Sequence, residues 1–267
     1  MKIVVFDLDE TLGYFTEYGI FWDCLKNYLE TKNKKIVLNQ EDFNNILDLF
    51  PEFMRPNIIN ILNYLKAKKG DKCCHKMMIY TNNQGPREWA HHITQYFENK
   101  LDFKLFDQII AAFKVNGKSV EVCRTTHNKT HRDLIKCTRL PKNAEICFID
   151  DMYYPHMANE NIYYINIKPY YHDLSFEYMI NKFKDSKCGK NIIDAETDID
   201  FDEFMKSQFK LYNYDINEKA PQEYNVDKII GKQIITHLQE FFNKSANNNS
   251  TRKNKYTNKR NKSHRRY

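Results

Sequence analysis

Two aspartates near the N-terminus have the spacing of a catalytic or metal-binding pair. Asp7 and Asp9 follow the apolar run KIVVF at residues 2–6, which has the composition of a buried strand in a parallel sheet. Because one residue separates them, both carboxylates can face the same cavity as the chain leaves the sheet. Two such carboxylates repel each other, and Mg²⁺ relieves that repulsion because it prefers oxygen ligands and also binds phosphate oxygens. With a strand before it, the pair predicts a magnesium site.

Two more apolar runs end in polar side chains. Thr81 and Asn82 follow the run KMMIY, and Asp150 and Asp151 follow the run EICFI. Helical patterns separate these runs, so the sequence predicts an α/β protein with a parallel sheet flanked by helices. Ligands bind outside the carboxyl ends of the strands in such sheets. We therefore expect Asp7, Thr81 and Asp150 to lie together at one edge.

Hydrophobic periodicity predicts the remaining elements. Further strands are expected at residues 108–115, 120–124 and 162–167, with Asn116-Gly117 as a hairpin turn. Helices are expected at residues 20–31, 41–49, 55–69, 86–97, 129–138, 174–184, 198–212 and 227–242. The helix that Pro56 opens has the clearest pattern, because proline is tolerated at the first helical position.

The polar strand ends belong to motifs that resemble those of a known family. The strand followed by DLDETL at residues 7–12 resembles motif I of the haloacid-dehalogenase-like (HAD) phosphatases. DLDETL is especially similar to the NLI-interacting-factor-like branch, which includes the small phosphatases of the RNA polymerase II C-terminal domain. MIYTNNQGPREWA is similar to motif II, ICFIDD is similar to motif IV, and Arg55-Pro56 resembles a helix start of that branch.

The resemblance covers residues 2–185 and implies a HAD-like Rossmannoid fold with no large cap domain. It also implies a Mg²⁺-dependent phosphomonoester hydrolase that forms an aspartyl-phosphate intermediate. Asp7 would be the nucleophile, and Asp9 would be the general acid that protonates the leaving alkoxide and then the base that activates water. Thr81 would hydrogen-bond a phosphoryl oxygen. The implied metal ligands are Asp7, Asp9 through its backbone carbonyl, Asp150 and Asp151, and the expected substrate-binding residues are Thr11 and Asn82.

A lysine near the start of the helix before motif IV completes the family pattern. Lys129 fits, because it begins a predicted helix and its side chain can swing toward the carboxyl edge of the sheet. Lys118, Arg132 and Lys136 are rivals, and Arg132-Asp133-Leu134 resembles the family's Lys-Asp-Leu. The sequence favours Lys129 but does not exclude the other three.

Three segments are expected: a HAD-like phosphatase domain at residues 1–185, a helical C-terminal extension at 186–243, and a basic tail at 244–267 with a disordered composition. Two departures from the family pattern concern the surroundings of the site. Gly13 follows DLDETL and is expected to act as a flexible hinge. Residues 20–50 are expected to form a helical addition near the site.

Three functions compete. The favoured one is a protein phosphatase for phosphoserine or phosphothreonine, because a site without a large cap admits macromolecules. The second is a phosphatase of small metabolites, nucleotides or nucleic-acid ends, with residues 20–50 as a lid. The third is a non-catalytic binding module, against which the complete set of Asp7, Asp9, Thr81 and Asp150 argues.

Composition limits the partners and the environment. The 267 residues carry a formal net charge of +6, but residues 244–267 hold nine basic residues and no acidic one, so the rest is slightly acidic. The tail predicts nucleic-acid contact, nuclear targeting or a solubilising role. No apolar stretch is long enough to cross a bilayer, and seven scattered cysteines indicate free thiols in a reducing compartment. We therefore expect an intracellular protein, cytoplasmic or nuclear, with no membrane partner.

Overall fold

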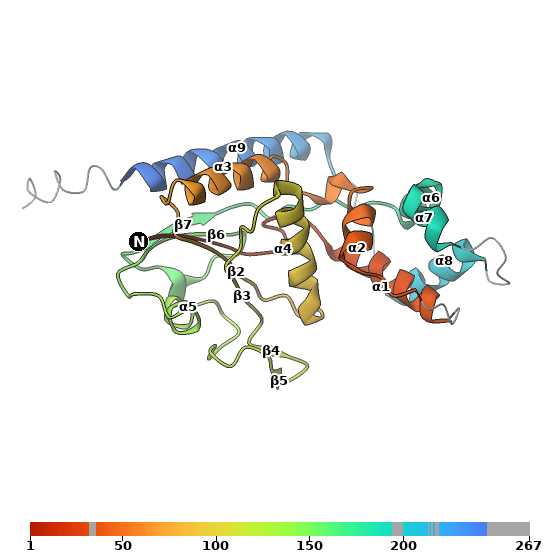
Figure 1. The fold of residues 1–267 in the computed structure, drawn as a ribbon, viewed down its shortest axis with the longest axis horizontal. Helices are drawn as coiled ribbons and strands as arrows, with labels where there is room; N and C mark the ends of the chain where they lie inside the picture. Colours follow the sequence, from red (N-terminus) through yellow and green to blue (C-terminus); the bar gives the residue numbers. More distant parts are fainter. Residues whose placement is uncertain (32–35, 194–199, 213, 215, 217–218, 245–267) are drawn as a thin grey trace, which may run out of the picture.

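A five-stranded parallel sheet forms the centre of the protein in a computed structural model (Figure 1). Its strand order is β3-β2-β1-β6-β7, and every pairing within it is parallel. The strands are β1 (Lys2–Phe6), β2 (Lys76–Tyr80), β3 (Gln108–Ile110), β6 (Glu145–Asp150) and β7 (Ile162–Asn166). The structure describes residues 1–31, 36–193, 200–212, 214, 216 and 219–244.

Each face of the sheet packs into a separate apolar core. Successive side chains of a strand point to opposite faces, and β1 follows this rule without exception. Val4 and Phe6 belong to the larger core, which also holds buried residues of the helices α1 (Thr16–Thr31), α3 (Ile58–Gly70), α4 (Arg87–Leu101) and α9 (Pro221–Asn243). Ile3 and Val5 belong to the smaller core, which includes Leu134 of helix α5 (His131–Thr138). The sheet is therefore covered by helices on both sides, as the sequence predicts.

The helices form two groups around this sheet. In chain order they are α1 (Thr16–Thr31), α2 (Gln40–Leu47), α3 (Ile58–Gly70), α4 (Arg87–Leu101), α5 (His131–Thr138), α6 (Phe176–Asp185), α7 (Lys187–Ile192), α8 (Phe201–Leu211) and α9 (Pro221–Asn243), with short 3₁₀ turns η1 (Pro51–Phe53) and η2 (Pro155–Met157). Helix α9 runs beside α3 over the sheet, whereas α1 and α2 gather with α6, α7 and α8 at one side (Figure 1).

The predicted helices are all present, with shifted ends. Helix α1 begins at Thr16 rather than at residue 20, and α9 begins at Pro221 rather than at residue 227. Pro221 occupies the first turn of α9, where its missing N–H has no intrahelical partner to lose. The segment predicted as one helix at residues 174–184 corresponds to α6, and a separate short helix, α7, follows it.

Two of the predicted strands are wrong. The run at residues 108–115 splits into β3 and the two-residue strand β4 (Lys114–Val115), and its partner β5 covers only Lys118–Ser119, so residues 120–124 are not a strand. The turn between β4 and β5 is confirmed, because Asn116 and Gly117 both have positive φ. The hairpin ends at Ser119, and Arg124 farther along the chain is buried outside any strand.

The prediction that three strand ends converge is confirmed. Strand β1 lies between β2 and β6, and Phe6 pairs with Ile79 on one side and Ile149 on the other. Since all three strands run in the same direction, Asp7 and Asp150 leave the sheet at the same edge as Thr81.

The expectation of seven free thiols is wrong for one pair. Cys123 and Cys137 form a disulfide, which ties the segment before α5 to the last turn of that helix. The scattered spacing gave no sign of this contact, because α5 folds back to bring Cys137 within reach of Cys123. Among the described residues, no helix is both long and apolar enough to span a bilayer. The predicted role of the basic tail concerns residues 245–267, which lie outside the described residues.

Candidate active site

The centre of the site is a buried lysine held between two aspartates. Lys129 Nζ donates hydrogen bonds to Asp7 Oδ1 and to Asp150 Oδ2, the second at 2.7 Å. All three side chains are buried, with Lys129 only 1% exposed. Burial by itself would lower the pKa of Lys129, but Asp7 and Asp150 outweigh that effect and hold the pKa above its usual range. Lys129 is therefore a permanent positive charge at the carboxyl edge of the sheet.

Of the four basic residues that the sequence leaves open, the structure brings only Lys129 to this edge. Lys118 is exposed on β5, and Arg132 and Lys136 are exposed on α5. The reason is the direction of the chain before α5. Lys129 precedes the helix cap Thr130 and still lies in the loop that passes beneath the site, whereas the exposed positions of α5 face away from the sheet.

A third carboxylate completes an acidic group with the geometry of a metal site. One ligand oxygen from each of Asp7, Asp150 and Asp151 lies within 4.8 Å of the others. Thr11 donates to Asp151 Oδ1 at 3.0 Å and accepts from the Asp151 N–H at 3.2 Å, so it orients this carboxylate. The sequence assigned Thr11 to substrate binding, and the structure shows that its hydroxyl contacts a metal-ligand candidate.

These residues fit a hard divalent cation. Asp7, Asp9, Asp150 and Asp151 gather around a single contacting lysine, so the described site carries an excess of negative charge. Burial raises the pKa of Asp150, and the nearby Asp7 adds to that effect while Lys129 opposes it. Burial, followed by the charge of Asp7, likewise raises the pKa of Asp151. Oxygen ligands and uncompensated negative charge are what Mg²⁺ requires.

Asp9 lies beside this group but has a different environment. Its Oδ2 accepts a hydrogen bond from Asn83 Nδ2 at 2.8 Å, and no contact to Lys129 forms. Burial, followed by the charge of Asp7, raises the pKa of Asp9 to about 6. A carboxyl group with this pKa is protonated in a useful fraction of molecules near neutral pH, as a general acid must be.

The segment after β2 forms the opposite wall of the site. Thr81 is buried, and its hydroxyl accepts a hydrogen bond from the Asn83 N–H at 2.9 Å, which closes a tight turn. Asn82 points away from Asp9: its amide donates to Tyr154 Oη at 3.0 Å and accepts from Arg124 Nη2 at 2.8 Å. Asn83, which the sequence did not single out, is the asparagine that donates to the predicted catalytic side chain Asp9.

Two buried arginines position the loops that carry the site, and the sequence gave neither of them that role. Arg124 donates to the carbonyls of Thr81, Ala111 and His127 at 3.0, 2.8 and 2.9 Å, so it joins the ends of β2 and β3 to the loop that holds Lys129. Arg55 donates to the carbonyls of Thr11, Glu10 and Lys168. Only Arg55 had a sequence signal, as part of the Arg55-Pro56 motif. Nothing in the sequence singled out Arg124.

Gly13 is a packing residue rather than the hinge that was expected. It pairs with Asp9 and with Met54 in isolated β-bridges. A Cβ atom at Gly13 would lie 2.5 Å from the Phe53 carbonyl oxygen and 2.6 Å from a ring carbon of Phe15. Only glycine fits here, and the close packing holds the turn that presents Asp9 in place.

Comparisons with protein-family models, curated proteins and solved structures found no match for this chain. The class of this protein is therefore described by its fold and its candidate site alone. The chain is an α/β protein with helices on both faces of a parallel sheet, and it carries a candidate site of aspartates and one lysine at the carboxyl edge of that sheet.

Proposed function

We propose that this protein is a Mg²⁺-dependent phosphomonoester hydrolase of the HAD type that acts through an aspartyl-phosphate at Asp7. The observation that carries the proposal is the buried arrangement of Asp7, Lys129 and Asp150, with Asp9 beside it in a protonatable state. Phosphate-monoester hydrolysis is among the slowest uncatalysed reactions, so a site for it must both supply a nucleophile and offset negative charge. This arrangement provides both.

Asp7, Asp150 and Asp151 would hold the metal, together with the backbone carbonyl of Asp9. Bound Mg²⁺ would neutralise phosphoryl charge and so allow an anionic carboxylate to approach the substrate. Lys129 contributes to the same end from the protein side, because its ammonium group touches the nucleophile directly. Thr81 follows the neighbouring strand, and its hydroxyl would donate to a phosphoryl oxygen.

Asp9 would transfer the proton in both steps of the reaction. Asp7 attacks phosphorus while Asp9 gives its proton to the leaving alkoxide oxygen, so the ester bond breaks as the Asp7–phosphorus bond forms. Asp9, now ionised, then takes a proton from the water that hydrolyses the aspartyl-phosphate, which restores both residues. The hydrogen bond from Asn83 orients Asp9 in both steps.

The favoured substrate is phosphoserine or phosphothreonine in a protein. The DLDETL motif supports this choice through its resemblance to the branch of C-terminal-domain phosphatases. The packing of helices α1 and α2 argues against the alternative of a lid over a small molecule. Phe21, Trp22 and Phe43 are fully buried and belong to the same core as the sheet, so these helices cannot open without exposing that core.

Hydrolysis of nitrophenyl phosphate in the presence of Mg²⁺ and of EDTA tests the proposal. The wild-type protein should show activity only with Mg²⁺, and Asp7→Asn should abolish it. Asp185→Asn is the matched control, because Asp185 is exposed at the end of α6 and remote from the site in sequence and fold. Activity in the Asp7→Asn variant comparable to that of the control would exclude the covalent route.

A further inference from the structure

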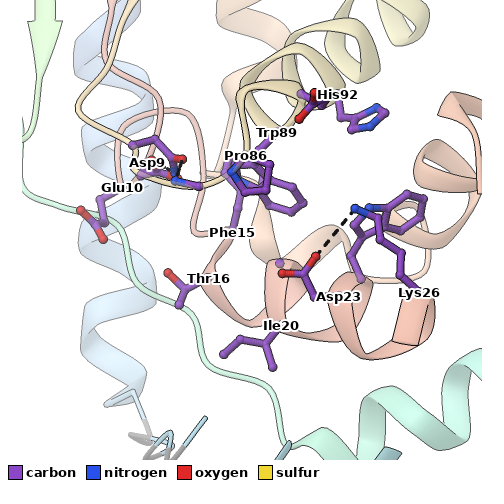
Figure 2. A pocket seen from close by; sticks show the side chains of 15 residues that line it. Asp9, Glu10, Phe15, Thr16, Ile20, Asp23, Lys26, Pro86, Trp89 and His92 are labelled. Carbon is purple, nitrogen blue, oxygen red and sulfur yellow. Dashed lines mark hydrogen bonds and ion pairs between the residues drawn. The ribbon is translucent and has the colours of Figure 1, made fainter. Parts of the chain in front are cut away.

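A cavity of about 400 Å³ opens beside Asp9, between helix α1 and the start of helix α4. Figure 2 shows Asp9 and Glu10 at one end of it and Asp23 and Lys26 at the other. The cavity therefore begins at the predicted general acid and runs away from the metal-ligand candidates. A substrate whose phosphate lies at Asp7 would place its neighbouring residues here.

Aromatic rings form part of the cavity wall. Phe15 and Trp89 both line it, and Trp89 lies directly against α1 because Gly19 has no side chain there. A Cβ atom at Gly19 would meet the Trp89 ring at 3.4 and 3.5 Å, so the ring contacts the helix backbone. Trp89 also packs edge-on against Phe43, with centroids 5.5 Å apart, which holds the ring in position. The wall is thus rigid and offers a π surface.

The charge of the side chains that line the cavity indicates which class of ligand it can bind. Acidic residues outnumber basic ones among the described side chains that line the cavity, where Lys26 is the single lysine or arginine. Lys26 forms an ion pair with Asp23 at 3.7 Å, which leaves the exposed Glu88 without a lysine or arginine partner among the described residues. A phosphodiester backbone would be repelled by this lining. A cationic side chain would be attracted by the carboxylates and by the aromatic faces.

We propose that this cavity is a specificity site for an arginine or lysine next to the phosphorylated residue of a peptide substrate. The proposal rests on the proposed phosphatase function for the position of the phosphate, and it adds the sequence context of the substrate. Glu88 supplies the charge from the first turn of α4, and Trp89 supplies a cation–π contact beside it. Glu10, next to Asp9 in the chain, also lines the cavity.

The test measures binding separately from turnover. Three phosphoserine peptides carry arginine, leucine or glutamate at the residues flanking the phosphoserine, and fluorescence anisotropy reports their affinity for Asp7→Asn. The arginine peptide should bind about tenfold more tightly than the glutamate peptide, as expected for one cation–π contact with a neighbouring carboxylate. Glu88→Lys, added to Asp7→Asn, should remove that preference. Glu203→Lys on α8 is the matched control and should retain it, because Glu203 is exposed and does not line the cavity.

Parallel hydrolysis of nitrophenyl phosphate by the wild-type protein separates the two proposals. If that substrate is hydrolysed but the three peptides bind equally, the cavity has no cation specificity and the phosphatase function stands. If the preference survives in Glu88→Lys, the cation binds elsewhere and the inference is wrong. If nitrophenyl phosphate is not hydrolysed but the Glu88-dependent preference is present, the phosphatase function fails and the cation site stands. A phosphorylated oligonucleotide that binds more tightly than every peptide would also overturn the inference.

Discussion

Replacing Lys129 with methionine removes the one lysine among the described residues that contacts Asp7 and Asp150, and it keeps a side chain of similar length. At the observed 2.7 Å between Lys129 Nζ and Asp150 Oδ2, the attraction is about 6 kcal/mol for an effective dielectric constant of about 20. Desolvation of the buried ions offsets much of this attraction. Loss of one member of a buried ion pair costs about 3–5 kcal/mol, since the remaining carboxylates stay buried without compensation. We expect Lys129→Met to lose that much stability in EDTA.

Two conditions should restore part of the stability that Lys129→Met loses. Mg²⁺ supplies positive charge to the same carboxylates, so the deficit should be smaller with Mg²⁺ than with EDTA. A lower pH should also reduce the stability deficit of Lys129→Met. Burial already raises the pKa of Asp150, and Lys129 opposes that rise, so removal of the lysine raises this pKa further above its unfolded value. The folded state then binds the proton more tightly than the unfolded state, and the deficit shrinks as the pH falls through the raised pKa.

Urea unfolding followed by circular dichroism measures these differences. Lys168→Met is the matched control, because Lys168 forms an exposed ion pair with Glu223 at 3.1 Å. Exposed pairs contribute about 0–1 kcal/mol, so this variant should lose little and should not respond to Mg²⁺. The reasoning is refuted if both variants lose equal stability, or if the loss in Lys129→Met is the same with Mg²⁺ and with EDTA.

Three more predictions concern single features of the structure. Asp9→Asn should lower kcat/KM on phosphoserine more than on nitrophenyl phosphate, by up to about 10²–10⁴-fold, because a serine alkoxide needs the proton and nitrophenolate does not. In the wild type, kcat/KM for phosphoserine should fall as the pH rises above the Asp9 pKa of about 6. Replacing Cys123 and Cys137 with serine should lower the free energy of unfolding by about 3 kcal/mol, given their separation of 14 residues, and an unchanged urea midpoint under oxidising conditions would contradict the disulfide. Gly13→Ala should lower thermal stability strongly, because its Cβ would overlap a backbone carbonyl, whereas Gly70→Ala should be neutral or stabilise by up to about 1 kcal/mol, since no atom lies within 4 Å of its Cβ.

The fold and the acidic part of the site were predictable because their signals are local. Nine consecutive residues show a buried strand followed at once by Asp7 and Asp9, and Asp150 likewise ends an apolar run that forms a strand. Parallel strands alternating with helices then require these strand ends to share an edge. The prediction of a hairpin strand at residues 120–124 was wrong because the deciding signal is not local. Arg124 in this run is buried and donates hydrogen bonds to the carbonyls of Thr81, Ala111 and His127, contacts that no short window of sequence reveals.

Only the tertiary structure decided which side chains join the aspartates. Lys129 and Asp7 are 122 residues apart, and the exposed rivals Arg132 and Lys136 lie in the same short segment as Lys129. Which basic residue of this segment reaches Asp7 depends on the path of the loop before α5. The hydrogen bonds of Arg124 hold that loop against the ends of β2 and β3.

The same distinction applies to the neighbouring positions Asn82 and Asn83. Both follow β2, and the turn closed by the Thr81 hydroxyl sends one toward Tyr154 and the other toward Asp9. Residue type and spacing therefore determined the chemistry available at the sheet edge, because a strand fixes the direction of the residues next to it. Packing between distant segments determined the partners, because the conformation of a loop is set by the contacts it makes across the fold.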